Sequence, residues 1–160
     1  MNILITGGAG FIGSHLAEAL LAQAATDGVR AAAVSYLATG MRIWENRPDD
    51  AIALAQSCAA DIADPHERQT LDLLVAGVEL DVGRPDRAAE IARTVFAAAS
   101  PGTASAATMI LVPALAAMGD LDESIAAADQ AIARAFGAEG QTLNDLGAHL
   151  LFRTAAAAPQ

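Results

Sequence analysis

The sequence of 160 residues has no lysine, one cysteine and only six aromatic residues. A single cysteine, Cys58, excludes a disulfide within the chain. The three histidines lie far apart, and neither Cys-x-x-Cys nor His-x-x-x-His spacing occurs, so we expect no metal site. Because aromatic residues and clusters of β-branched residues are scarce, the composition disfavours buried parallel strands.

Positive charge is scarce as well. Nine arginines face nineteen acidic residues, which gives a formal net charge of −10. This excess of negative charge disfavours binding to nucleic acid or to an anionic membrane. The longest apolar stretch, residues 109–118, is too short to span a bilayer and contains Pro113. No basic region precedes the apolar N-terminus, so we expect no secretory signal and a cytoplasmic location by default.

Alanine, by contrast, occurs 41 times. Alanine loses the least conformational entropy when it enters a helix, so this bias favours many closely packed helices. The length suits one domain with a core of its own. The composition therefore predicts a mainly helical protein.

Three glycines in the spacing Gly-x-x-Gly-x-x-Gly follow a short apolar run at residues 2–6. The residues from Ser14 to Leu21 then have a helical pattern. This order predicts a strand, a tight turn and a helix start. At such a turn, backbone N–H groups and the helix dipole can hold a pyrophosphate.

Residues 1–23 resemble the opening of the extended short-chain dehydrogenase/reductase family, the NAD-dependent epimerases and dehydratases. The resemblance rests on the run Thr-Gly-Gly-Ala-Gly-Phe-Ile-Gly-Ser-His-Leu at residues 6–16. It implies that NAD or NADP, if the loop is functional, lies against the glycines and the backbone beside them. The cofactor-binding residues implied in this way are Gly7, Gly10, Phe11, Ile12 and Gly13.

Two features of that family are missing. Its Tyr-x-x-x-Lys pair cannot form, because Tyr36 is the only tyrosine and Gly40 stands four residues later. The candidate second strand, residues 29–34, lacks the acidic residue that would hold the ribose, since Asp27 comes too early and Glu45 too late. We therefore expect no catalysis in the family's manner and assign no catalytic residue.

The rest of the chain contains a recurring segment. A turn residue, Asn46, Gly83 or Gly119, precedes each of three helix-like segments that begin with acidic residues. Equivalent small residues in these segments are 37 and then 36 positions apart, a period typical of helix–turn–helix repeats. Each segment has a stripe of small or apolar residues that should let helices approach closely. The three stripes are Ala51/Ala55/Cys58, Ala88/Ala92/Val95 and Ser124/Ala128/Ala131.

Residues 36–136 resemble degenerate tetratricopeptide-type repeats, and residues 115–124 are similar to the helical arrays of large LuxR-type bacterial transcriptional regulators. The tryptophan, glycine and tyrosine expected in the first helix of each repeat are mostly missing. The resemblance implies a concave helical groove for a protein or peptide partner.

Several side chains have simpler predicted roles. Acidic residues at helix starts should compensate helix dipoles, and Tyr36 and Trp44, eight positions apart on one predicted helix, should pack rather than stack on a ligand. Three arginines form either a polar strip or a solvated face. They are Arg84, Arg87 and Arg93.

The predicted fold is therefore mainly α. A Rossmann-like strand–glycine loop–helix segment over residues 1–28 precedes a tetratricopeptide-like array over residues 29–160, which ends in a capping helix. The predicted function is a helical-repeat interaction module without catalysis, with a vestigial dinucleotide-binding N-terminus and no bound cofactor. The alternative is a fragment of an NAD(P)-dependent epimerase or dehydratase that retains nucleotide binding. An unpaired first strand would also allow pairing with a second copy of the chain.

Overall fold

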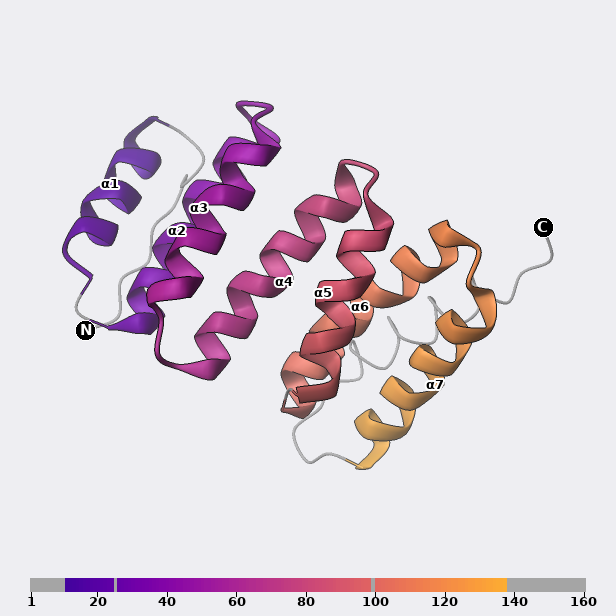
Figure 1. Cartoon of the computed structure of the whole chain (residues 1–160). Coiled ribbons are helices and arrows are strands. Elements are labelled where there is room, and N and C mark those ends of the chain that lie inside the picture. The colour runs from indigo at the N-terminus through magenta and orange to yellow at the C-terminus, as the bar shows by residue number, and fades with distance from the viewer. Residues whose placement is uncertain (1–10, 25, 99, 138–160) are drawn as a thin grey trace. The chain divides into compact units, whose positions relative to one another are not determined.

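The computed structural model describes residues 11–24, 26–98 and 100–137, and every element in these ranges is an α-helix (Figure 1). The chain divides into two compact units, residues 1–78 and 79–160, and the division falls within the fourth helix. In chain order, the described helices are α1 (Phe11–Ala22), α2 (Asp27–Ile43), α3 (Pro48–Asp61), α4 (Pro65–Asp81), α5 (Pro85–Ala98), α6 (Pro101–Met118) and α7 (Leu121–Gly137).

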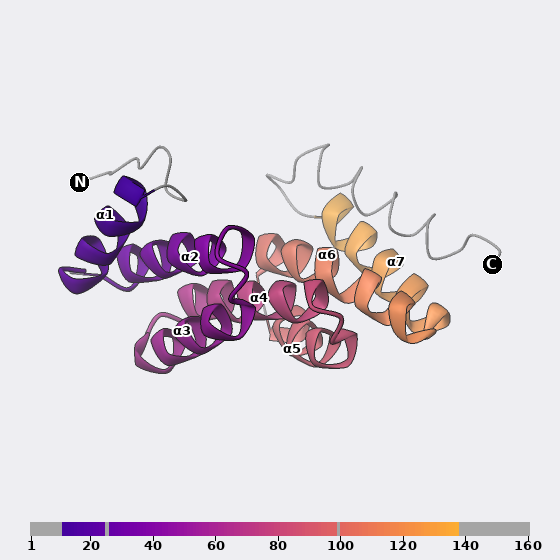
Figure 2. The ribbon, with the colours of Figure 1, turned by 90° about the horizontal axis from the view of Figure 1, so that it is seen from above.

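In the first unit, α2 packs against both α1 and α3, as Figures 1 and 2 show. Its core is made of small and branched side chains, among them Val34, Ile62 and Leu71, which are almost fully buried. Thr26 caps α2, because its hydroxyl accepts a hydrogen bond of 3.3 Å from the backbone N–H of Val29.

In the second unit, α6 packs against both α5 and α7. Apolar side chains such as Val112 and Leu115 fill the space between these helices. Pro113 lies inside α6, where its ring removes one backbone donor. Next to it, the buried Ser124 hydroxyl of α7 donates a 3.0 Å hydrogen bond to the Val112 carbonyl, which ties α7 to α6.

The three predicted turn residues are confirmed. Asn46, Gly83 and Gly119 have φ angles of 53°, 78° and 86°, and no other described residue has a positive φ. Prolines Pro48 and Pro85 then start α3 and α5, where a missing N–H costs nothing. The turns and helix starts therefore agree with the local sequence signals.

The predicted stripes of small residues are also confirmed as core positions. All nine side chains are buried, and the three equivalent residues, Ala51, Ala88 and Ser124, each stand fourth in their helix. The recurrence therefore has a structural counterpart in α3, α5 and α7. The assignment of these helices to the tetratricopeptide type stays a prediction, as does the domain boundary at residue 28.

The predicted fold class is wrong in its Rossmann-like part, whereas its mainly helical part agrees with the structure. No strand occurs among residues 11–24, 26–98 and 100–137. The candidate second strand, residues 29–34, is helical within α2, because its alanines favour a helix over an extended segment. The predicted first strand, at residues 2–6, and the predicted C-terminal capping helix lie outside the described residues.

The predicted packing of two aromatic side chains is wrong. Tyr36 and Trp44 are 43% and 68% exposed. Trp44 is the C-cap residue of α2, directly after the last helical residue, Ile43.

Candidate functional site

The N-terminal glycine segment ends at the start of α1. Gly7 and Gly10 lie outside the described residues, whereas Phe11, Ile12 and Gly13 form the first turn of α1. Backbone N–H groups in a first turn have no partner within the helix, and together with the helix dipole they favour an anion. The first turn of α1 contains no acidic residue that would oppose an anion.

The acidic residue nearest to the expected ribose position has another role. Asp27 stands at the start of α2, and its Oδ2 atom accepts hydrogen bonds of 2.9 Å from the backbone N–H groups of both Ala63 and Asp64. These two donors belong to the loop between α3 and α4. The Asp27 carboxylate therefore joins the start of α2 to this loop, a contact that sequence spacing does not reveal.

The Cys58 thiol shows no sign of activation. It is buried on the stripe of α3, and burial raises the pKa of the thiol, while the nearby Arg30 has a smaller, opposite effect. A raised pKa keeps the thiol protonated, and the protonated form is a poor nucleophile. The prediction that Cys58 is a packing residue therefore agrees with its burial.

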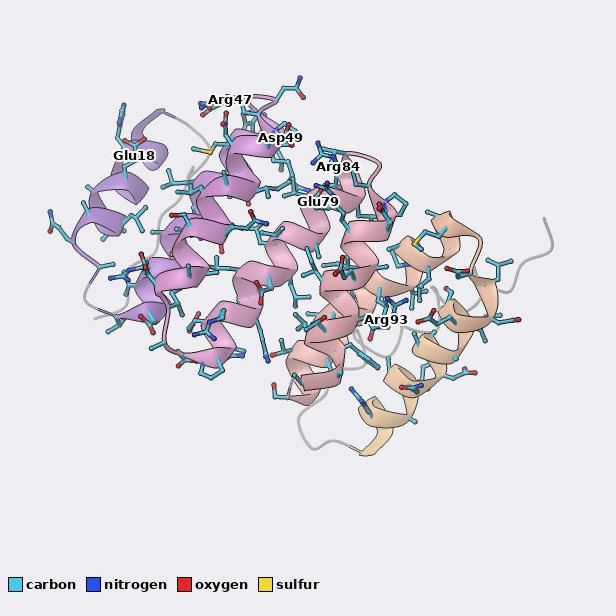
Figure 3. The ribbon with its side chains drawn as sticks, viewed as in Figure 1. Glu18, Arg47, Asp49, Glu79, Arg84 and Arg93 are labelled. Carbon is cyan, nitrogen blue, oxygen red and sulfur yellow. The ribbon has the colours of Figure 1, made fainter. Side chains whose placement is uncertain are left out.

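The three arginines of the predicted polar strip pair with acidic side chains. Arg84 and Arg87 contact the buried carboxylate of Glu79 at 3.0 and 3.8 Å, and Figure 3 shows Glu79 and Arg84 pointing toward one another. Arg93 contacts Oε1 of Glu123 on α7 through Nη2 at 2.8 Å and through Nε at 2.9 Å. Because the Glu79 carboxylate is buried, loss of its arginine partners would leave an uncompensated buried charge.

A pocket of about 190 Å³ lies in the second unit, between α5 and α7 and above α6. Its floor consists of three buried side chains, Phe96, Leu111 and Ala127. Exposed residues form its rim, namely Arg93, Glu123, Ala126 and Gln130. No motif or spacing in the sequence predicts this pocket, because it forms where alanines on α7 leave the space beside Phe96 unfilled.

Arg134 contacts Phe96, one of the residues in the floor of the pocket. Its guanidinium lies 4.2 Å from the centre of the Phe96 ring, and its Nη1 donates a 3.0 Å hydrogen bond to the Phe96 carbonyl near the end of α5. Arg134 therefore makes a cation–π contact with the Phe96 ring and a hydrogen bond with the Phe96 backbone. These contacts hold the Phe96 side chain in place.

Two further classes of site are absent from the part of the chain that the structure describes. No group of three His, Cys, Asp or Glu side chains there could hold a metal ion. Likewise, none of the described helices combines the length and the apolar character needed to cross a membrane. The cytoplasmic location stays a prediction.

The comparisons with known proteins give one match. A sequence model described as the NAD dependent epimerase/dehydratase family matches residues 3–97. No curated protein and no solved structure matches the chain. The matched range includes all three glycines of the N-terminal segment and extends into α5.

Proposed function

Because the chain belongs to the NAD dependent epimerase/dehydratase family, we propose that it binds the pyrophosphate of NAD or NADP at its N-terminal glycine segment. The observation that carries this proposal is the family match over residues 3–97, which includes Gly7, Gly10 and Gly13. In the family, glycines at these positions let the backbone approach the pyrophosphate closely.

The start of α1 supports the proposal. Phe11 follows Gly10 in the sequence and begins α1, and the first N–H groups of a helix have no acceptor within that helix. The absence of acidic residues from this first turn favours an anion there. The residues present therefore fit a pyrophosphate.

The ribose is held less firmly than in a complete dinucleotide site. Asp27 has its carboxylate engaged by the loop between α3 and α4. An acidic residue on the ribose normally disfavours a 2′-phosphate, and Asp27 is engaged elsewhere. We therefore expect NAD and NADP to bind with similar affinity.

Binding is proposed here without catalysis. The chain contains no lysine, so the family's Tyr-x-x-x-Lys pair cannot form. Arginine is a poor replacement because its planar guanidinium differs in geometry and hydration from an ammonium group. The proposed activity is the nucleotide-binding part of an epimerase or dehydratase.

Calorimetric titration of the whole chain with NAD and with NADP tests the proposal. We expect measurable binding to both cofactors and its loss in a Gly10→Val variant, where a branched side chain would block the pyrophosphate. A Gly102→Val variant is the matched control, since the space around Gly102 at the start of α6 is open. The absence of heat at cofactor concentrations of about 1 mM would overturn the proposal. A Kd of about 1 mM corresponds to a binding free energy of roughly −4 kcal/mol.

A second function, a helical module that binds a protein or peptide, is favoured by a different observation. The equivalent stripe positions of α3, α5 and α7 are all buried, as expected for helix pairs that share a core. Such modules leave the outer faces of their helices for partners. Purification of a tagged chain from its host, followed by reconstitution with each purified candidate, tests this function, and failure to reconstitute any complex would count against it.

A further inference from the structure

The four residues that α7 contributes to the pocket stand at positions i, i+3, i+4 and i+7. They are Glu123, Ala126, Ala127 and Gln130. Residues at this spacing share one face of a helix, and four of them enclose the hole that accepts one side chain of a neighbouring helix in knobs-into-holes packing. The pocket therefore has the layout of an unfilled hole on α7.

The hole has the size and chemistry for one apolar side chain. Its volume of about 190 Å³ exceeds that of a cavity of roughly 150 Å³ that holds benzene. Phe96 and Leu111 give it an apolar floor, and both are buried. The alanines leave the space open, because their side chains are too short to reach across to α5.

Acidic residues near the hole favour an apolar side chain that is flanked by basic residues. Exposed acidic residues stand on both helices that border it, Glu90 on α5 and Asp122 on α7, whereas Arg93 on the rim is paired with Glu123. The whole chain also carries a formal net charge of −10. A partner with basic residues beside its apolar side chain is therefore attracted to this surface.

We propose that the hole between α5 and α7 is a docking site for a basic amphipathic helix of a partner protein, which inserts one leucine or phenylalanine beside Phe96. This proposal rests on the second function above and names its surface and its class of partner. The ion pair between Arg93 and Glu123 borders the insertion point. The partner helix lies across α5 and α7 with its basic residues facing the acidic ones.

Two synthetic peptides of about 15 residues, rich in alanine and lysine, are suitable probes. One has a single central leucine, and the other has alanine at that position, so they share the same charge. Each is titrated into the isotope-labelled whole chain while the amide NMR signals of α7 are followed. We expect the leucine peptide to bind at least tenfold more tightly, the equivalent of about 1.4 kcal/mol, and to shift the signals of Ala126, Ala127 and Gln130.

Variants of the chain locate the binding. Ala127→Leu fills the hole from inside, and Ala126→Leu covers it from the exposed rim, where folding is not at risk. Both should remove the difference between the two peptides. Ala133→Leu, at another exposed position of α7, should preserve it.

Three results would overturn the proposal. The first is equal affinity of the two peptides. The second is a preference for leucine that survives both hole variants, which would leave the interaction module standing but place its surface elsewhere. The third is occupation of the hole by the chain itself, detected as a dimer that Ala127→Leu dissociates or as NMR contacts between residues 141–156 and Ala127.

Discussion

At the scale of single residues, backbone angles decide where the helices end. Gly119 ends α6 in the left-handed region, and the N–H of Asp120 then donates to the Leu115 carbonyl at 3.0 Å. Gly83 follows α4 in the same way, with the N–H of Arg84 donating to the Glu79 carbonyl at 2.9 Å. Both contacts satisfy carbonyls that the helix leaves without partners.

Replacing Gly119 should isolate the cost of this backbone angle. Gly119→Ala should lower the free energy of unfolding by about 1 kcal/mol, because a Cβ disfavours a φ of 86° while the surrounding space is open. Gly102→Ala is the control, since Gly102 is also in open space and has no positive φ. Denaturant unfolding measures both; equal effects would rule out the backbone angle as the cause.

Asp72 gives the molecule a dependence on pH. Burial raises the pKa of its carboxyl, and Arg68 opposes that shift with a smaller effect. A carboxyl whose pKa is raised in the folded state contributes stability that is complete below its unfolded pKa of about 3.9 and is lost as pH rises through the folded value. Asp72→Asn removes the partly buried charge and should therefore raise the melting temperature at neutral pH. The rise should be small, because the Asp72 side chain is only partly buried.

The same variant should have no advantage at about pH 3, where the carboxyl is protonated in both the folded and unfolded states. Melting curves of the original chain and the Asp72→Asn variant across this range provide the check. A stabilisation that is independent of pH would show that the carboxylate charge is not its source.

At the scale of helices, small side chains set the spacing between neighbours. Ala88 and Ala92 on α5 have no exposed surface. With only a methyl group at each position, the helix in contact can approach closely, and larger side chains such as Val95 and Phe96 fill the remaining space. This close approach explains how helices with few aromatic residues form a packed core in the second unit.

A larger side chain on the stripe should separate the helices. We expect Ala92→Leu to lower the free energy of unfolding by about 1–3 kcal/mol through overpacking. Ala97→Leu, on the exposed face of the same helix, should change it by less than about 0.5 kcal/mol. Thermal or denaturant unfolding distinguishes the two, and equal values would show that Ala92 has room beside it.

At the scale of the whole molecule, two features stand side by side. The family match covers residues 3–97, and yet the described part of that range consists of α1 to α5 without a strand.

The second feature is charge, because nineteen acidic residues repel one another around nine arginines. Self-repulsion of this kind destabilises a compact chain.

Salt should therefore stabilise the protein. Raising the ionic strength from about 0.01 M to about 0.15 M shortens the Debye length from roughly 30 to 8 Å, which screens the repulsion between distant acidic residues. Salt also weakens exposed ion pairs such as Arg47–Asp50, but such pairs contribute only about 0–1 kcal/mol each. The melting temperature should rise over this range in sodium chloride, and a fall would show that the ion pairs outweigh the repulsion.

The local features of this fold could be predicted from the sequence, whereas the lack of strands among the described residues and the pocket could not. Asn46, Gly83 and Gly119 were identified as turn residues because few other residues accept a positive φ. The glycine spacing, by contrast, indicated a family and was wrongly extended to a Rossmann-like fold. The glycine spacing indicates a local turn that can approach a ligand, and it carries no information on whether later residues form neighbouring strands.

Period and composition were thus enough to predict the three helices that follow the turn residues, their starts and their buried stripes, because those signals act over a few residues of chain. Three contacts depended on how the helices stack. Asp27 meets the N–H of Ala63 across 36 residues, Arg93 meets Glu123 across 30, and Arg134 meets the Phe96 carbonyl across 38. Hydrogen bonds and ion pairs at such separations leave no periodic pattern in the sequence. They form only when packing brings a donor and an acceptor from distant parts of the chain within about 3 Å of each other.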